Sequence, residues 1–218
     1  MMPRTLRSVI EARSILTNDG IALEAELATP VDFPLRAAVV LCHPHPQYGG
    51  TMRSIVISAL FAGLPRAGVA CLRFNFRGVE ASAGTHDAGR AEQLDVRAAV
   101  DTLGVEFPDS PLLLTGWSFG ADMALVTIDD RIDAWFAIAP PLRFASDFSA
   151  VANDARPKLL ALAEHDEFRP PESVLAEVAS WDATHAEIVP GASHFFVGRT
   201  DRLVELALGY VSRVASTQ

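Results

Sequence analysis

Short apolar runs alternate with helical patterns along most of this chain, an order that few folds accommodate. Strands are expected at 15–17, 21–28, 37–42, 69–76, 111–115, 133–139, 158–163 and 187–189. Helices are expected at 55–64, 91–103, 119–128, 171–180 and 202–214. Several middle strands are apolar almost throughout, as when helices cover both faces of a parallel sheet. The sequence therefore predicts a doubly wound α/β sandwich with its site at the carboxyl ends of the strands.

The chain suits one domain over residues 1–218, because half of its 218 residues are hydrophobic and no linker or internal repeat interrupts them. In the pattern at 91–103, apolar residues recur at helical spacing, and Gly104 is expected to end the helix.

Charge and cysteine content exclude several classes of protein. Charged residues make up 21% and the net charge is −9, with no basic block, so neither nucleic acid nor a membrane surface is an expected partner. No secretory signal and no membrane-spanning stretch are recognised. Cys42 and Cys71 lie in apolar runs and are expected as buried, reduced thiols. A cytoplasmic protein is expected, and nothing in the sequence indicates an oligomeric state.

The pentapeptide GWSFG at 116–120 lies between an expected strand and an expected helix. A glycine two residues to either side of the serine lets the chain turn sharply and leaves the hydroxyl exposed at the strand end. That context is typical of a nucleophile elbow, which makes Ser118 the candidate nucleophile.

A nucleophilic serine needs a base within hydrogen-bond reach, and the base needs an orienting carboxylate. In this type of sheet the partners follow in the order serine, acid, histidine. His194 is best placed, because it follows the strand expected at 187–189 in a flexible turn before the last helix. His185 precedes that strand, at the opposite edge of the sheet, and is expected to be a solvated loop residue. His165 is expected beside the acid or at the surface.

Three carboxylates after the strand expected at 158–163 compete for the role of the acid. Asp166 is favoured, because it falls in the loop and its short side chain suits a close imidazole contact. Glu164, on the strand end, is the second candidate, and Glu167 is the third.

An oxyanion intermediate needs two preorganised backbone donors. One is expected from Phe119, the residue after the nucleophile. The other is expected from the loop after the strand at 37–42, which reads HPHPQYGG at 43–50. The two prolines of this loop have no N–H, so His45 is the expected donor and Gln47 the next.

Ser118, Asp166 and His194 resemble the triad of the α/β-hydrolase superfamily. The segments HPHPQYGGTM at 43–52 and RFNFRGV at 73–79 resemble those of small bacterial serine hydrolases without a lid, often labelled dienelactone-hydrolase-like. This likeness spans residues 41 to 196. It implies a single-domain α/β-hydrolase fold, with a mostly parallel central sheet and no cap domain, and a serine hydrolase without a cofactor.

The chain departs from these relatives in two places. Dienelactone hydrolases use a cysteine nucleophile where this chain has Ser118, so their lactone specificity is not carried over. Many superfamily members have an Asp-x-Arg-Gly-x-Gly-x-Ser loop, in which Asn75 and Glu80 here replace the aspartate and the second glycine. That loop usually supports the site, and Arg77 is expected to hold the loop rather than bind substrate.

His43 and His45, one residue apart at a strand end, resemble a metal pair. One metallohydrolase family needs Asp-His after such a pair, where this chain has Gln47 and Tyr48, and the barrel amidohydrolases need a longer chain. No metal is therefore expected.

Aromatic residues flank the candidate nucleophile and histidine. Trp117 is expected in the core, whereas Tyr48, Phe168 and Phe195 are candidates to line an apolar substrate pocket. Only residues 141–157 separate the sixth strand from the acid-bearing strand, enough for one short helix and no cap. A shallow, open site for small acyl groups is expected.

These observations predict hydrolysis of carboxylic esters, with a small-molecule acyl compound as substrate. Thioesters and small amides use the same machinery, and the sequence does not separate them. A non-catalytic binding protein on the same fold is the alternative from another class, although such proteins commonly lack a triad member.

Overall fold

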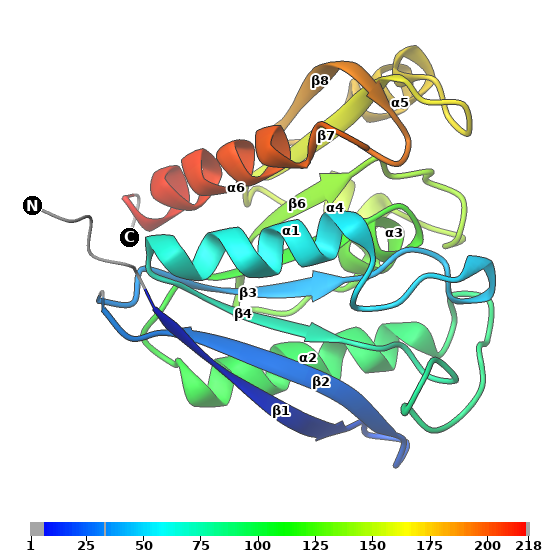
Figure 1. Ribbon diagram of the computed structural model, residues 1–218. Coiled ribbons are helices and arrows are strands. Elements are labelled where there is room, and N and C mark those ends of the chain that lie inside the picture. Colours follow the sequence, from blue (N-terminus) through cyan, green and yellow to red (C-terminus); the bar gives the residue numbers. More distant parts are fainter. Residues whose placement is uncertain (1–6, 33, 217–218) are drawn as a thin grey trace, which may run out of the picture.

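The computed structural model describes residues 7–32 and 34–216, which build one eight-stranded sheet (Figure 1). In spatial order the strands are β1 (Ser8–Leu16), β2 (Ala22–Pro30), β4 (Val69–Phe74), β3 (Ala37–Cys42), β5 (Leu112–Trp117), β6 (Ile132–Ile138), β7 (Lys158–His165) and β8 (Thr184–Ser193). β2 runs antiparallel to both β1 and β4, and every other neighbouring pair is parallel. The predicted mostly parallel sheet is confirmed.

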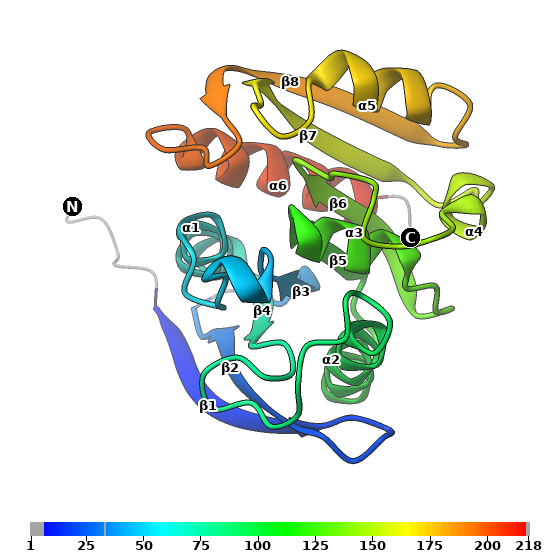
Figure 2. The ribbon, with the colours of Figure 1, turned by 90° about the vertical axis from the view of Figure 1, so that its right-hand side faces the viewer.

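Helices cover both faces of the sheet, and each face has its own apolar core (Figure 2). On one face lie α1 (Ile55–Gly63) and α6 (Thr200–Ala215). On the other lie α2 (Glu92–Glu106), α3 (Phe119–Val126), α5 (Pro171–Val178) and the short α4 (Ser149–Ala152). β3 and β5 are buried along their whole length, which explains why their sequences are apolar without alternation.

The two edge strands are longer than the sequence patterns indicate. β1 covers nine residues where the prediction gave only 15–17, because most of its side chains are exposed and it lacks an apolar run. β8 includes Pro190 and Gly191, which the prediction assigned to a turn. Pro190 is tolerated because β8 has a neighbour on one side only. His185 consequently lies inside β8, at the amino edge of the sheet, rather than in a loop before it.

Gly104 does not end the helix that precedes it. α2 continues to Glu106, and a β-carbon on Gly104 would lie 3.0 Å from the side chain of Arg131. The glycine allows α2 to lie close to the side chain of Arg131. The predicted helix end at residue 103 was therefore wrong, because the helix continues to Glu106.

The carboxyl ends of the parallel strands meet at one edge of the sheet, and the loops that leave them surround Ser118. The connection at 141–157 contains only α4, so no cap domain is inserted there. This agrees with the single-domain fold without a cap that the sequence predicts.

Candidate active site

Ser118 lies on a strained turn between β5 and α3. Its φ and ψ are 55° and −121°, a conformation that side chains rarely adopt. A β-carbon on Gly116 would lie 2.0 Å from the carbonyl oxygen of Gly120, so the turn leaves no room for a side chain at that position. The geometry matches the nucleophile elbow predicted from the GWSFG segment.

Gly120 brings the elbow against the end of β3. A β-carbon on Gly120 would lie 2.3 Å from the carbonyl oxygen of Cys42 and 2.5 Å from that of His43. The absence of a side chain therefore lets the first turn of α3 touch the backbone from which the 43–50 loop departs. The two segments expected to supply oxyanion donors are adjacent for this reason.

The structure brings Ser118, His194 and Asp166 together from three separate strand ends. The Ser118 hydroxyl lies 2.9 Å from Nε2 of His194, and Nδ1 of His194 lies 2.8 Å from Oδ2 of Asp166. His194 and Asp166 are buried, whereas Ser118 is partly exposed. In this arrangement Nδ1–H donates to the carboxylate, which leaves Nε2 free to accept the serine proton.

Asp166 remains a carboxylate in spite of its burial. Burial raises its pKa, but the hydrogen bond from His194 and those from the backbone N–H groups of Arg169 and Phe168 outweigh burial and leave the pKa below its usual value. The two backbone donors lie 3.0 Å from Oδ1, which keeps Oδ2 pointed at the imidazole.

The two other carboxylates of this loop hold backbone groups near His194. Glu164 accepts a hydrogen bond from the N–H of Gly191 at 2.7 Å, and Glu167 accepts one from the N–H of His194 at 3.2 Å. Neither side chain contacts the imidazole nitrogens within the described residues. His165 is exposed beside Glu164, as expected for a surface residue.

The two expected oxyanion donors, the N–H groups of Phe119 and His45, belong to residues next to Ser118 in the chain and on the wall of the same cavity, respectively. Phe119 is the first residue of α3, so its N–H has no acceptor inside the helix. The N–H of Gln47 donates to Nδ1 of His45, which removes the second candidate of this loop. The N–H of His45 has no acceptor among residues 7–32 and 34–216, and the His45 carbonyl accepts from both Tyr48 and Gly50.

His43 is a buried structural residue. Its Nδ1–H donates to the carbonyl of Pro44 at 2.6 Å, and its Nε2 accepts from the N–H of Phe76 at 3.0 Å. Burial lowers the pKa of His43 to about 3, so the imidazole is neutral at ordinary pH. Because both ring nitrogens are engaged by the backbone, His43 has no lone pair left for a metal.

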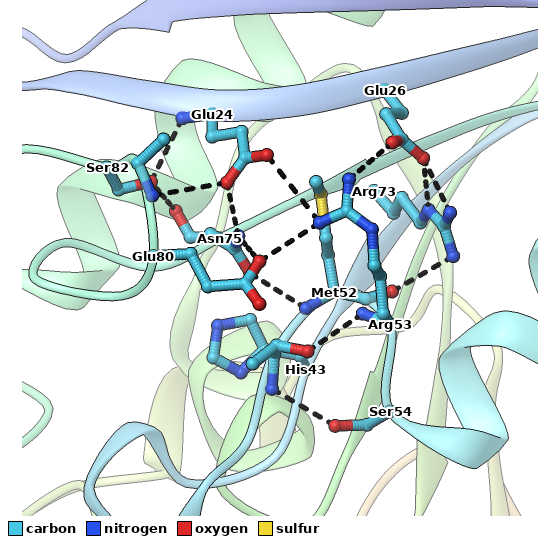
Figure 3. A network of polar contacts seen from close by, with 12 residues as sticks. Glu24, Glu26, His43, Met52, Arg53, Ser54, Arg73, Asn75, Glu80 and Ser82 are labelled. Carbon is cyan, nitrogen blue, oxygen red and sulfur yellow. Dashed lines mark hydrogen bonds and ion pairs between the residues drawn. The ribbon is translucent and has the colours of Figure 1, made fainter.

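A polar network behind the 43–50 loop ties it to the sheet (Figure 3). Asn75 accepts a hydrogen bond from the N–H of Met52 at 2.8 Å and donates to Glu24 and Glu80 at 2.7 and 2.8 Å. Arg73 donates to the Met52 carbonyl at 3.2 Å. Both backbone groups of Met52 are therefore held by side chains from β4 and its exit loop. Arg77 pairs with Asp19 and Asp95 and holds its own segment, as predicted.

A cavity of about 520 Å³ opens beside Ser118, within the range of small-molecule sites. Tyr48, Phe168 and Phe195, the three aromatic candidates from the sequence, all line it. Trp117 is buried as expected and donates from its indole N–H to the His194 carbonyl, but it also reaches the cavity wall.

The loop after β6 contributes a wall of the cavity that was not predicted from the sequence. Pro141, Arg143 and Phe144 line the cavity, and the Phe144 ring packs on His45 and Phe119 with centroids 4.9 and 5.3 Å apart. The Pro-Pro pair at 140–141, directly after a buried strand, was the available signal for a rigid loop at this edge.

No helix in the part of the chain that the structure describes is long and apolar enough to cross a membrane. The same residues contain no group of three or more His, Cys, Asp or Glu side chains arranged as metal ligands.

Comparisons with known proteins place the chain in a family. No protein-family model matches it. An uncharacterised protein of Rickettsia prowazekii is 33% identical over 200 residues, which are 87% of this chain and 83% of that protein. Among solved structures, an α/β serine hydrolase homologue from Coxiella burnetii is 32% identical, with a TM-score of 0.80 over 92% of this chain and 96% of its own. An α/β serine hydrolase without a lid from Xanthomonas campestris is 29% identical, with a TM-score of 0.83 over 98% and 96%. The chain therefore belongs to the α/β-hydrolase superfamily, beside its serine hydrolases without a lid, and is a hydrolase.

Proposed function

We propose that this protein hydrolyses carboxylic esters through Ser118, His194 and Asp166. The observation that carries the proposal is the continuous hydrogen-bonded chain from Asp166 through His194 to Ser118, at a strained elbow that faces a cavity. A substrate carbonyl in that cavity meets the hydroxyl with the base already in place.

The first half of the reaction forms an acyl-enzyme. Ser118 Oγ attacks the acyl carbon while Nε2 of His194 takes the hydroxyl proton, and the carbonyl electrons move onto oxygen. The N–H groups of Phe119 and His45 stabilise that oxyanion. The intermediate then breaks its bond to the alcohol oxygen, which leaves with the proton from His194. Asp166 stabilises the imidazolium throughout.

The second half returns the enzyme to its starting state. A water molecule gives its proton to His194 and attacks the acyl carbon of the ester on Ser118. When this second tetrahedral intermediate collapses, Ser118 Oγ recovers the proton from His194 and the carboxylic acid leaves.

A fluorophosphonate probe tests the proposal directly. We expect one adduct, located by mass spectrometry at Ser118, and its loss in Ser118→Ala and in His194→Ala. Ser118→Ala is expected to abolish ester turnover and to leave thermal stability nearly unchanged, because the hydroxyl adds only one hydrogen bond to an intact fold.

Absence of labelling in a folded protein, or full ester turnover by Ser118→Ala, would contradict the proposal. The same preparations, offered a thioester and an anilide of the same acyl group, measure which of the three acyl classes is cleaved fastest. The carboxylic ester is expected to lead. Tight binding without turnover would favour the non-catalytic alternative.

The cytoplasmic location stays a prediction.

A further inference from the structure

The cavity beside Ser118 contains one permanently charged side chain among the described residues that line it, Arg143. The remaining polar side chains of its wall are two histidines, two serines and a tyrosine. Arg143 is exposed and reaches the cavity from the loop after β6. A substrate that enters this otherwise apolar cavity therefore meets a fixed positive charge, although the protein carries a net charge of −9.

The guanidinium of Arg143 has no acidic partner in the part of the chain that the structure describes. Other arginines near the site are paired: Arg53 and Arg73 with Glu26, and Arg77 with Asp95. Arg143 instead lies over the ring of Phe144, with Cζ 5.0 Å from the ring centroid. Its donors are consequently available to a ligand, and a guanidinium matches the planar, two-oxygen geometry of a carboxylate.

The backbone that carries Arg143 is held to the elbow helix. Asp122, fully buried on α3, accepts the N–H groups of Leu142, Arg143 and Phe144 at 2.9, 2.9 and 3.0 Å. These three hydrogen bonds fix the backbone of Arg143 relative to Ser118. Less conformational freedom is therefore lost when the guanidinium binds an anion.

The cavity has two walls, one beside His194 and one beside the expected oxyanion donors. An ester presents its alcohol part to one wall and its acyl part to the other. Phe168 and Phe195 pack on the His194 ring, with centroids 4.7 and 5.7 Å away, and His194 protonates the leaving alcohol. Phe144 packs on His45 and Phe119, on the oxyanion side. The charge of Arg143 reaches that side, since it is one of the groups that lower the pKa of His45, after burial and His86. An acyl arm that lies opposite the leaving alcohol would run along the wall that carries Arg143.

We propose that Arg143 selects acyl groups that end in a carboxylate, so that the preferred substrates are monoesters of short dicarboxylic acids. This inference rests on the ester hydrolysis at Ser118 proposed above and adds the substrate class. The carboxylate binds the guanidinium at the far end of the acyl chain, and the chemistry at Ser118 is unchanged.

A pair of substrates of equal shape tests the inference. The 4-nitrophenyl monoester of adipic acid carries the charge, and 4-nitrophenyl 6-methylheptanoate has an isopropyl group in place of the carboxylate. We expect kcat/KM of the wild type to be higher for the charged ester. The ratio of the two values is expected to fall about fivefold in Arg143→Gln and to fall less in Arg143→Lys, which keeps the positive charge but not the two-oxygen geometry. Added salt is expected to lower the wild-type ratio, because the arginine is exposed.

Arg97→Gln is the matched control. Arg97 is an exposed arginine on α2 that does not line the cavity, so its loss lowers the net charge equally without changing the ratio. A wild-type ratio of one or less would overturn the inference, and so would an equal fall in Arg143→Gln and Arg97→Gln. In either case, turnover of the neutral ester would still support the proposed function. A preference for 4-carboxyphenyl acetate over phenyl acetate that depends on Arg143 would overturn the assignment to the acyl arm. Failure to cleave any of the esters would refute both.

Discussion

At the scale of single residues, burial and local hydrogen bonds together set the protonation states of His43 and Asp166. His43 is the most pronounced case, because burial keeps its imidazole neutral while two backbone groups use both ring nitrogens. In the unfolded chain the same imidazole has its ordinary pKa of 6.5. Acid therefore protonates His43 in the unfolded state first, and the folded state loses stability as the pH falls below that value.

We expect His43→Gln to flatten the pH dependence of stability. Between pH 6.5 and 5 the wild type should lose about 2 kcal/mol of unfolding free energy through His43, at about 1.4 kcal/mol per pH unit. Glutamine does not titrate, so the variant should lose less over the same interval, after an initial cost of about 1 to 2 kcal/mol for poorer packing. Urea denaturation at pH 7.5, 6.5 and 5 measures this. Parallel curves for the two proteins would refute it.

At the scale of elements, the loop that carries His45 depends on the segment after β4. The side-chain amide of Asn75 acts both as acceptor and as donor. Its oxygen accepts a hydrogen bond from the N–H of Met52, and its nitrogen donates to the carboxylates of Glu24 and Glu80. An aspartate, the usual residue of this loop in the superfamily, cannot donate to them. An asparagine at this position therefore supplies the donor that Glu24 and Glu80 need and that an aspartate lacks.

We expect Asn75→Asp to cost about 3 kcal/mol of unfolding free energy near neutral pH, because it places a third carboxylate in a buried position against two others. The variant is expected to lower kcat more than it raises KM, because the side chain that holds Met52 and the His45 loop is disturbed. Glu80→Gln in the same chain restores an amide donor and should recover part of both losses. Denaturation and steady-state kinetics on the four proteins of this cycle measure the coupling; additive effects would contradict it.

At the scale of the whole molecule, no inserted domain covers the cavity, because the connection between β6 and β7 holds only the short α4. A lid that opens at a lipid surface has no structural counterpart among residues 7–32 and 34–216. The cavity opens between the loops at the carboxyl edge of the sheet, so under the proposed function substrate enters there from solution.

We therefore expect no interfacial activation. The rate of tributyrin hydrolysis, followed by titration of released acid, should rise smoothly with concentration and show no jump where the substrate passes its solubility limit. A short-chain ester that stays in solution over the whole range serves as the control. A jump for tributyrin alone would show that a surface opens the site.

The succession of strands and helices along the chain follows from the sequence, because several central strands are almost entirely apolar and the pattern of α2 repeats apolar residues at helical spacing. The position of Ser118 is equally local, since two glycines and a strand–helix boundary define the turn. Edge strands carry exposed side chains, so the length of β1 and the course of β8 through Pro190 were not predictable from such patterns.

Only the tertiary structure decided which carboxylate contacts His194 and what surrounds the substrate. Asp166, Glu164 and Glu167 differ by one to three positions, and their directions depend on how β7 ends against β8. Arg143 reaches the cavity because Asp122, twenty-one residues earlier, binds its backbone. A sequence specifies local periodicity through neighbouring residues, whereas a site depends on contacts between segments that only packing brings together.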